Sequence, residues 1–205
     1  MITKSDIRDT VLSKLTQRPK LYRFRDSHVI ENKIIDYIKK SNTKSILLYI
    51  SMPNEANTHK IISWCRQRGI RVFVPFMVGS SFIVVQYRLP LYKKRFNIYE
   101  PKISKKYRKK GIDIAIVPVI SIDKSGRRIG FGKGMYDRFF AREGRHIGKT
   151  IFVAKDLYIY DGLITQEYDI KSDYIVSTRY SIIKSYIKSI KRLKVPPRYQ
   201  KGKWL

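Results

Sequence analysis

The stretch Ile112–Pro118, IDIAIVP, is the most apolar short run in the sequence, and it predicts a buried strand at the centre of a sheet. It leads into residues 119–133, VISIDKSGRRIGFGK, which we interpret as a glycine-rich loop. Gly134–Arg142 then has the apolar spacing of a helix. A buried strand that passes through such a loop into a helix is typical of an α/β protein.

Predicted strands and helices alternate along most of the remaining chain. The apolar spacing indicates helices at 5–15, after a cap at Asp26-Ser27 and at 56–68, and it indicates strands at 45–50, 71–75, 81–88, 150–153 and 174–176. This alternation predicts a single-domain, three-layer α/β/α fold over residues 1–180, with a mostly parallel central sheet and helices on both faces. Residues 181–205 are predicted to form a basic C-terminal helix and a tail.

The composition points to one folded domain in a reducing compartment. The 205 residues are 43% hydrophobic, which is enough for one packed core. No apolar run reaches about 18 residues, so no membrane span is expected. The N-terminus lacks the apolar centre of a signal peptide, and the single cysteine, Cys65, cannot form an internal disulfide. We therefore expect a cytoplasmic protein, and we expect a monomer.

The net charge is strongly positive, because 44 Lys and Arg residues against 16 Asp and Glu residues give +28. Such a charge attracts polyanions, so an RNA-associated protein that uses its fold as a scaffold is one interpretation. The basic residues are spread from Lys4 to Lys203, however, and the chain is also rich in Ile, Tyr, Asn and Ser, as A/T-rich codons would produce. We favour this compositional bias and do not expect nucleic acid as the main partner.

The glycine-rich loop carries the residues that point to chemistry. The alternating glycines of residues 130–134 let a phosphate approach the backbone, and the loop amides and the start of the next helix favour negative charge. Arg128 and Lys133 add positive charge, and the carboxylate of Asp137 could hold Mg²⁺ beside a phosphate. The spacing is neither that of the usual P-loop nor that of the dinucleotide fingerprint.

Residues 123–138, DKSGRRIGFGKGMYDR, resemble the signature of the 5-formyltetrahydrofolate cyclo-ligase family, also called methenyltetrahydrofolate synthetases. That signature runs roughly D-x-x-G-x-R-[LI]-G-x-G-x-G-[YF]-Y-D. Shorter matches follow in the family's order, at Lys4–Arg8, 51–58, Glu100-Pro101 and Asp169–Asp173. The resemblance covers residues 4–178, which is nearly the whole chain.

The resemblance implies an ATP- and Mg²⁺-dependent conversion of 5-formyltetrahydrofolate to 5,10-methenyltetrahydrofolate. ATP would phosphorylate the formyl oxygen, ADP would leave, and phosphate would leave as the ring closes. This chemistry requires no protein nucleophile, so catalysis would come from positioning and from stabilisation of charge. Arg128 and Lys133 are the residues expected to stabilise the transferred phosphoryl group.

The resemblance also implies binding roles, residue by residue. The residues implied for ATP are Lys4, Arg8, Arg128, Ile129, Gly130, Phe131, Gly132, Lys133, Gly134, Met135 and Tyr136. Those implied for the folate are Ile50, Glu55, Phe131, Gly132, Lys133, Gly134 and Met135, and those implied for Mg²⁺ are Asp137 and Asp169. Glu55 also fits on chemical grounds, because the edge of a pterin offers several N–H donors and a carboxylate can accept two at once.

Two positions depart from the family pattern. Met135 stands where the family has the first of two tyrosines, and residues 153–156 contain no glutamine where the family carries one. A thioether still packs on an aromatic ring, so we expect a weaker contact at Met135 and not the loss of the site. The departures leave a second alternative open, namely an ATP-dependent ligase that acts on a different acceptor.

Overall fold

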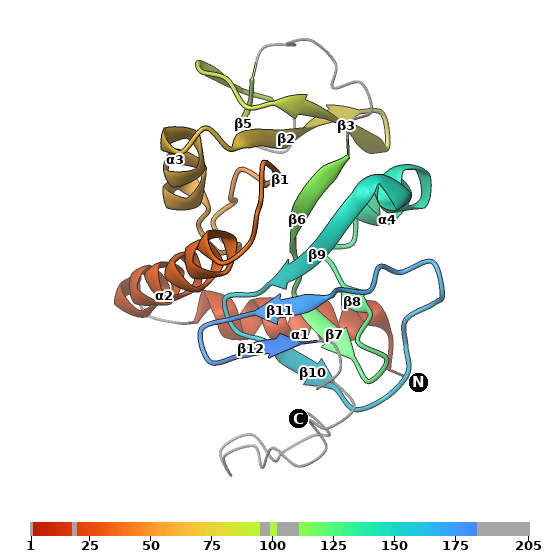
Figure 1. The fold of residues 1–205 in the computed structure, drawn as a ribbon. Helices are drawn as coiled ribbons and strands as arrows, with labels where there is room; N and C mark the ends of the chain where they lie inside the picture. The colour runs from red at the N-terminus through yellow and green to blue at the C-terminus, as the bar shows by residue number, and fades with distance from the viewer. Residues whose placement is uncertain (1, 18–19, 95–98, 102–110, 184–205) are drawn as a thin grey trace.

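The computed structural model describes residues 2–17, 20–94, 99–101 and 111–183 (Figure 1). The helices are α1 (Lys4–Thr16), α2 (Lys20–Lys39), α3 (His59–Gln67) and α4 (Met135–Glu143), with a short 3-10 helix at Gly144–His146. The strands are β1 (Ser45–Leu47), β2 (Arg71–Val78), β3 (Ser81–Gln86), β4 (Leu91–Lys93), β5 (Tyr99–Pro101), β6 (Ile112–Pro118), β7 (Ser121–Asp123), β8 (Arg128–Ile129), β9 (Ile147–Val153), β10 (Tyr158–Tyr160), β11 (Tyr174–Val176) and β12 (Ser181–Ile183).

A seven-stranded sheet forms the middle layer, in the order β12-β11-β9-β6-β1-β2-β3. The inner strands β11, β9, β6, β1 and β2 are parallel to one another. The edge strands β3 and β12 are antiparallel to β2 and β11. Strand β6 occupies the middle of the sheet, so the central position predicted for the apolar stretch at 112–118 is confirmed.

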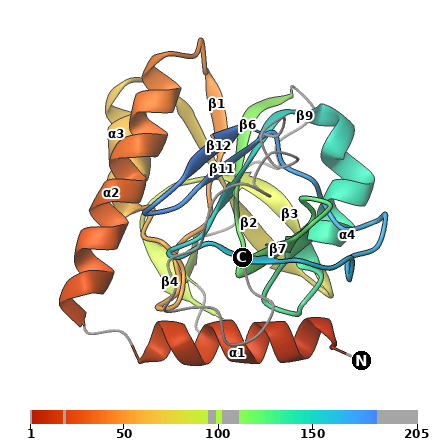
Figure 2. The same cartoon turned by 90° about the horizontal axis from the view of Figure 1, so that it is seen from below.

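Alternate side chains of the central strands enter two separate cores. Ile114 and Ile116 of β6 pack with residues of α2 and α3, whereas Ala115 and Val117 pack on the other side with Phe139 of α4. Figures 1 and 2 show the same arrangement, with α2 and α3 on one face of the sheet and α4 on the other. The predicted three-layer α/β/α architecture with helices on both faces is therefore confirmed.

Helix α1 packs on a second, smaller sheet. The order of this three-stranded sheet is β10-β7-β8. Ile7 and Val11 of α1 are fully buried in a cluster that includes Ile120 and Ile129, so α1 covers this sheet (Figure 2). The packing brings the first turn of α1 next to the glycine-rich loop, although more than a hundred residues separate the two segments in the sequence.

Two local predictions are wrong. Asp26 and Ser27 do not cap a helix, because α2 begins at Lys20 and contains both. Residues 119–133 are also not all loop, because they include β7 and β8. Strands β7 and β8 pair across residues 124–127, and β7 also pairs with β10, a partner distant in the sequence that no local pattern could reveal.

The predicted C-terminal helix requires a correction at its start. Residues 181–183 form β12, which pairs antiparallel with β11 at the edge of the main sheet. Pairing with an open strand edge satisfies the backbone there, and this tertiary contact outweighs the local helical pattern. The rest of the prediction, residues 184–205, lies outside the described residues.

Candidate functional site

The candidate site lies at the topological switch point of the main sheet, where the order in which strands are added reverses. From β1 the chain first adds β2 on one side, and it later adds β6 and β9 on the other side. Ligands of open α/β sheets bind at the carboxyl ends of the strands at such a switch point. Two adjoining hollows are found there, which we call the apolar pocket and the cationic cleft.

The apolar pocket has a volume of about 100 Å³ and is lined by residues from several strands and loops. Ile50 follows β1, and Pro118 ends β6. Three of the chain's four methionines, Met52, Met77 and Met135, line the pocket. The aromatic lining residues are Tyr49, Phe82, Tyr99, Phe131 and Tyr136. Flexible thioethers among aromatic rings form a surface that can adapt to a flat ligand.

Glu55 is the buried acidic group of the apolar pocket, with only 8% of its surface exposed. Its Oε2 accepts a hydrogen bond of 2.9 Å from the backbone N–H of Met52. Burial raises the pKa of Glu55 to about 7, although the Met52 N–H and the positive charge of Lys155 both act to lower it. Both protonation states are therefore present near neutral pH, and a ligand that offers N–H donors would favour the carboxylate.

The loop that carries Glu55 is tied to the end of β1. The Tyr49 hydroxyl donates to the backbone oxygen of Ala56 over 2.9 Å. The Thr58 hydroxyl donates in return to the backbone oxygen of Tyr49 over 2.6 Å. The Lys155 ammonium donates to the backbone oxygen of Pro53 over 2.6 Å. These contacts hold the Glu55 carboxyl at the pocket wall.

The cationic cleft has a volume of about 390 Å³ and adjoins the pocket. Its charged lining residues are the cations Lys4, Arg8, Arg128 and Arg138 and the carboxylates Asp137 and Asp169. Four cations against two carboxylates leave the cleft net positive. Arg128 and Gly134 line both hollows, so they mark the junction between them.

The alternating glycines of the loop make space for arginine side chains. A Cβ atom at Gly130 would lie 2.9 Å from Nη1 of Arg128, and one at Gly134 would lie 2.8 Å from Nη1 of Arg138. A Cβ atom at Gly132 would lie 3.3 Å from Cζ of Arg8, and the φ of +91° at Gly132 also disfavours other residues. The glycines thus let three guanidinium groups pack directly on the loop backbone.

Arg128 and Asp137 form a partly buried ion pair. The Arg128 guanidinium donates to both carboxylate oxygens of Asp137, over 2.9 Å from Nε and 2.6 Å from Nη2. Only 5% of the Arg128 side chain is exposed. Burial opposes the charged form of Asp137, but the hydrogen bonds and charge of Arg128 outweigh it and lower the pKa of that carboxyl. Arg128 is thereby held rigidly at the junction of the two hollows.

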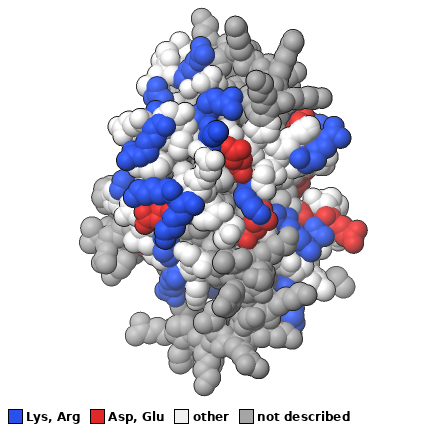
Figure 3. Space-filling view, in the orientation of Figure 1, with Lys and Arg blue, Asp and Glu red and all other residues white. Residues whose placement is uncertain are grey.

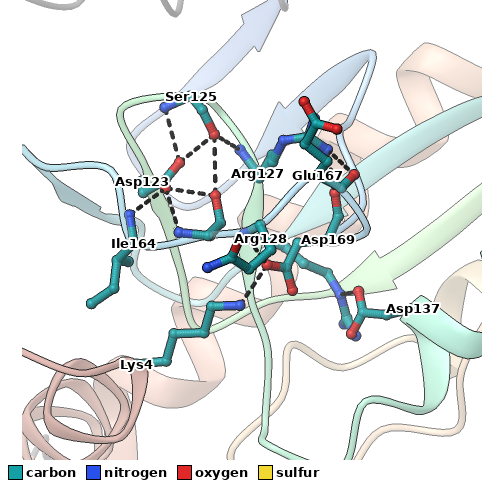
Figure 4. A network of polar contacts seen from close by, with 11 residues as sticks. Lys4, Asp123, Ser125, Arg127, Arg128, Asp137, Ile164, Glu167 and Asp169 are labelled. Carbon is teal, nitrogen blue, oxygen red and sulfur yellow. Dashed lines mark hydrogen bonds and ion pairs between the residues drawn. The ribbon is translucent and has the colours of Figure 1, made fainter.

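Lys4 and Asp169 form the second ion pair of the cleft (Figure 4). The Lys4 ammonium lies 2.5 Å from Oδ2 of Asp169, which also accepts a bond from the backbone N–H of Gln166 over 2.6 Å. The same ammonium lies 5.5 Å from the ring centre of Tyr168. This pair connects the first turn of α1 to the segment before β11.

A network of hydrogen bonds around Asp123 supports the start of the glycine-rich loop (Figure 4). One Asp123 oxygen accepts from the N–H and the hydroxyl of Ser125. The other accepts from the N–H of Ile164 and from the N–H and the hydroxyl of Thr165. Burial opposes ionisation, but these bonds lower the pKa of Asp123. The hydrogen bonds to Asp123 thus join the start of the loop to the segment that carries Asp169.

Most residues implied by the resemblance line one of the two hollows. Those lining the apolar pocket are Ile50, Glu55, Phe131, Lys133 and Met135, and those lining the cleft are Lys4, Arg8, Gly130, Gly132, Asp137 and Asp169. Tyr136, implied for ATP, lines the apolar pocket and not the cleft. Ile129, also implied for ATP, lines neither, because its side chain is 1% exposed beneath α1.

Sequence reasoning missed several lining residues. Met77, Phe82 and Tyr99 reach the pocket from β2, β3 and β5, and nothing local in the sequence marks them as neighbours. Arg138 could have been found, because it directly follows Asp137, the last position of the family signature. Its guanidinium bonds to the backbone oxygens of Ser80 and Lys133, which connects the loop to the turn between β2 and β3.

Two further features concern the distribution of surface charge and the length of the helices. On the face shown in Figure 3, Lys and Arg residues are scattered, and Asp and Glu residues lie among them. Within the part of the chain that the structure describes, no helix is both long enough and apolar enough to cross a membrane.

Comparison with known proteins connects this geometry to named relatives. The model of the 5-formyltetrahydrofolate cyclo-ligase family matches residues 1–178. A probable 5-formyltetrahydrofolate cyclo-ligase of Caenorhabditis elegans is 27% identical over 195 residues, which is 88% of this chain and 95% of the relative. The 5-formyltetrahydrofolate cyclo-ligase of Escherichia coli strain K12 is 26% identical over 140 residues, 65% of this chain and 77% of the relative.

Solved structures show that the fold is shared. The 5,10-methenyltetrahydrofolate synthetase of Aquifex aeolicus has a TM-score of 0.74 at 22% identity and covers 98% of this chain and 100% of its own. The corresponding synthetase of Mycoplasma pneumoniae has a TM-score of 0.66 at 20% identity and covers 86% of this chain and 99% of its own. Because the family model spans nearly all of the described fold and both hollows, the chain belongs to the 5-formyltetrahydrofolate cyclo-ligase family.

Proposed function

We propose that this protein converts 5-formyltetrahydrofolate to 5,10-methenyltetrahydrofolate, using ATP and Mg²⁺ and releasing ADP and phosphate. The observation that carries the proposal is the junction of an apolar pocket holding a buried carboxyl with a net-positive cleft. The pocket suits a flat heterocycle with N–H donors, and the cleft suits a polyphosphate. The family to which the chain belongs supplies the identity of the folate.

Folate binding would use the walls of the apolar pocket. The aromatic rings and the thioethers pack against the pterin ring, as such groups do on flat aromatic ligands. The Glu55 carboxylate accepts from N–H groups at the pterin edge, in the only part of the lining that carries a buried acid. In this orientation the formyl group would face Arg128, which lines both hollows.

Phosphoryl transfer would occur at that junction. The formyl oxygen attacks the γ-phosphorus of ATP, the bond from this phosphorus to the bridging oxygen breaks, and ADP leaves. The neighbouring folate nitrogen then attacks the activated carbon and loses its proton, the carbon–oxygen bond breaks, and phosphate leaves as the ring closes. Arg128 and Lys133 stabilise the transferred group, and a well-placed cation or donor contributes about 3–4 kcal/mol in comparable sites.

The carboxylates of the cleft fit a magnesium ion that binds together with ATP. Mg²⁺ commonly uses one or two protein carboxylates along with substrate phosphates and water. Asp137 and Asp169 both line the cleft, and within the described residues no group of three or more His, Cys, Asp or Glu side chains could hold a metal alone. Each carboxylate is paired with a cation of the protein but keeps further lone pairs, so the metal would bind Asp137 and Asp169 while Arg128 and Lys4 stay in place beside the phosphates. The metal would neutralise phosphate charge there.

The decisive experiment is an absorbance assay for the methenyl-folate product. Purified protein is mixed with 5-formyltetrahydrofolate, ATP and Mg²⁺, and reactions without ATP or without Mg²⁺ serve as controls. Product that depends on both would support the proposal. Folate binding without any product would instead favour an ATP-dependent ligase with another acceptor. RNA retention at physiological salt, with no folate binding, would favour the RNA-associated alternative that the +28 charge motivates.

A further inference from the structure

Tyr136 carries a buried hydroxyl that has no hydrogen-bond partner. Among the described residues, only the hydroxyls of Tyr136 and Ser172 are buried side-chain polar atoms without a partner. Folded proteins seldom keep such a group unless a ligand or water pairs with it, because an unpaired buried hydroxyl lowers stability. Ser172 lines neither hollow, whereas Tyr136 lines the apolar pocket. The unpaired hydroxyl thus belongs to the wall of a binding pocket.

The contacts of the Tyr136 ring hold it in place without satisfying its hydroxyl. The ring packs edge-on against Phe82, with centres 5.0 Å apart. The guanidinium carbon of Arg128 lies 5.3 Å from the Tyr136 ring centre. Burial and the negative charge of nearby Glu55 raise the pKa of the Tyr136 phenol, so it stays protonated and can only donate its proton in a hydrogen bond or accept one.

Tyr49, which lines the same pocket, provides a comparison, because its hydroxyl has a hydrogen-bond partner in the protein. Its hydroxyl donates to the backbone oxygen of Ala56 over 2.9 Å. No equivalent protein acceptor is present for Tyr136 among the described residues. The thioethers of Met52, Met77 and Met135 line the same pocket and can shift to give a ligand access to the hydroxyl.

We infer that the Tyr136 hydroxyl donates a hydrogen bond to a carbonyl oxygen of the bound folate. The inference rests on the proposed function and assigns Tyr136 to the folate, whereas the family resemblance implied ATP. Tyr136 as a donor and Glu55 as an acceptor form a complementary pair in one pocket. Such a pair selects a ligand that presents a carbonyl oxygen and N–H groups together, because a ligand without the carbonyl leaves the hydroxyl unpaired.

The test is Tyr136→Phe, which keeps the ring and removes only the hydroxyl. The dissociation constant of 5-formyltetrahydrofolate, measured by calorimetry without ATP, should rise about tenfold, because the ligand carbonyl loses its donor in a buried site. The KM for ATP should stay unchanged. The Tm of the ligand-free variant should not fall, because the hydroxyl has no protein partner to lose. An unchanged folate dissociation constant, or a loss confined to the KM for ATP, would overturn the inference.

A second ligand identifies the acceptor oxygen. 5-Methyltetrahydrofolate keeps the ring carbonyl but lacks the formyl oxygen. If Tyr136→Phe weakens binding of both folates, the acceptor is a carbonyl that the two share, such as the ring carbonyl. If it weakens only binding of the 5-formyl compound, the acceptor is the formyl oxygen, and either result supports the inference.

Two matched variants control for general effects of losing a hydroxyl. Tyr49→Phe removes a hydroxyl that bonds Ala56, so its Tm should fall. Ser172→Ala removes the other unpaired hydroxyl and should leave folate binding unchanged. The binding measurements need no turnover. A wild-type protein that binds 5-formyltetrahydrofolate without converting it would therefore contradict the proposed function and still leave the role of Tyr136 to be decided by its own variant.

Discussion

The cationic cleft and the apolar pocket share a border but are held together in opposite ways. The cleft is built from charges that are already paired, with Arg128 on Asp137 and Lys4 on Asp169, and its arginines pack on the loop backbone. The pocket is built from aromatic rings and mobile thioethers, and its polar groups, Glu55 and the Tyr136 hydroxyl, have few protein partners. One region is rigid before any ligand arrives, and the other is completed by its ligand.

This difference separates two kinds of defect. Fixed charges stabilise a transition state only if they are already in position, so damage to the cleft should lower turnover. A pocket lined by flexible side chains tolerates substitution, so changes there should alter folate affinity and its pH dependence and leave the phosphoryl transfer intact. Each variant below is expected to follow one of these two patterns.

The largest effect is expected for Arg128→Ala. Turnover should fall about 10²-fold or more, because a positioned donor to the transferred group is lost. Asp137 also loses its bidentate partner, so the Tm should drop as well. Arg128→Lys keeps the charge but cannot form the bidentate hydrogen bond to Asp137, and it should recover only part of the activity. Steady-state kinetics and thermal unfolding measure both effects, and wild-type turnover in Arg128→Ala would remove Arg128 from the mechanism.

The two carboxylates of the cleft should differ when they are neutralised. Asp137→Asn and Asp169→Asn should each raise the Mg²⁺ concentration needed for half-maximal activity. Asp137→Asn should also reduce stability by about 3–5 kcal/mol, because it leaves the buried Arg128 charge without its ion-pair partner. Asp169→Asn should cost less, since the Lys4 side chain is 26% exposed and can turn to water. Mg²⁺ titrations that overlay the wild type would contradict the metal assignment.

Gly132→Ala tests the packing of arginine on the loop. A side chain at φ +91° costs about 1–2 kcal/mol, and its Cβ would press on the guanidinium of Arg8. The KM for ATP should therefore rise, while the affinity for folate alone stays the same. Gly144→Ala is the matched control, because its φ is −56° and its new Cβ would meet only the side chain of Phe140 at 3.4 Å. Equal KM values for ATP in the two variants would argue against the packing role.

Glu55 should give the pocket its pH dependence. Its pKa is raised from 4.5 to about 7 in the folded state, so the folded protein binds a proton more tightly than the unfolded chain. The wild type should therefore lose stability, by up to about 3 kcal/mol, as pH rises from about 4.5 to about 7. Over the same rise, folate capture should improve, because the carboxylate that accepts N–H donors is formed.

Glu55→Gln removes this titration. Its unfolding free energy should lack the decline between pH 4.5 and 7, and its kcat/KM for 5-formyltetrahydrofolate should no longer increase with pH in that range. Chemical denaturation and initial rates across pH 5 to 8 measure both. A Gln variant with the wild-type pH profile would show that another group controls folate capture.

The smallest effect is expected from the overall charge. A net charge of +28 attracts a folate with a polyglutamate tail at long range, and salt screens this attraction beyond about 8 Å at physiological ionic strength. Added salt should therefore raise the KM for polyglutamylated folate more than for the monoglutamate. Equal salt dependence for the two substrates would contradict electrostatic capture. Deletion of residues 184–205, which leaves β12 in place, separates this effect from an RNA-binding tail.

The same division explains what the sequence could predict. The cleft comes largely from one continuous segment, 123–138, whose glycine and arginine spacing can be read directly, and the apolar β6 and the α/β alternation set the fold around it. The apolar pocket could not be read in this way, because Phe82 and Tyr99 reach it through strand pairing that joins distant segments. The small sheet was missed partly for the same reason, as β7 pairs with β10, 37 residues later. Its other pair, β7 with β8, is local but joins strands of only three and two residues.

The packing of each loop glycine against an arginine also constrains how this sequence can change over time. A side chain at position 132 would press on the full-length arginine at position 8, and positions 128 and 138 bear on positions 130 and 134 in the same way. A shorter residue at position 8 would relax the steric limit at position 132, although the positive φ there would remain. Substitutions at the two partners should therefore be non-additive in a double-mutant cycle. Among homologues, these pairs of positions should covary, including positions 8 and 132, which are far apart along the chain.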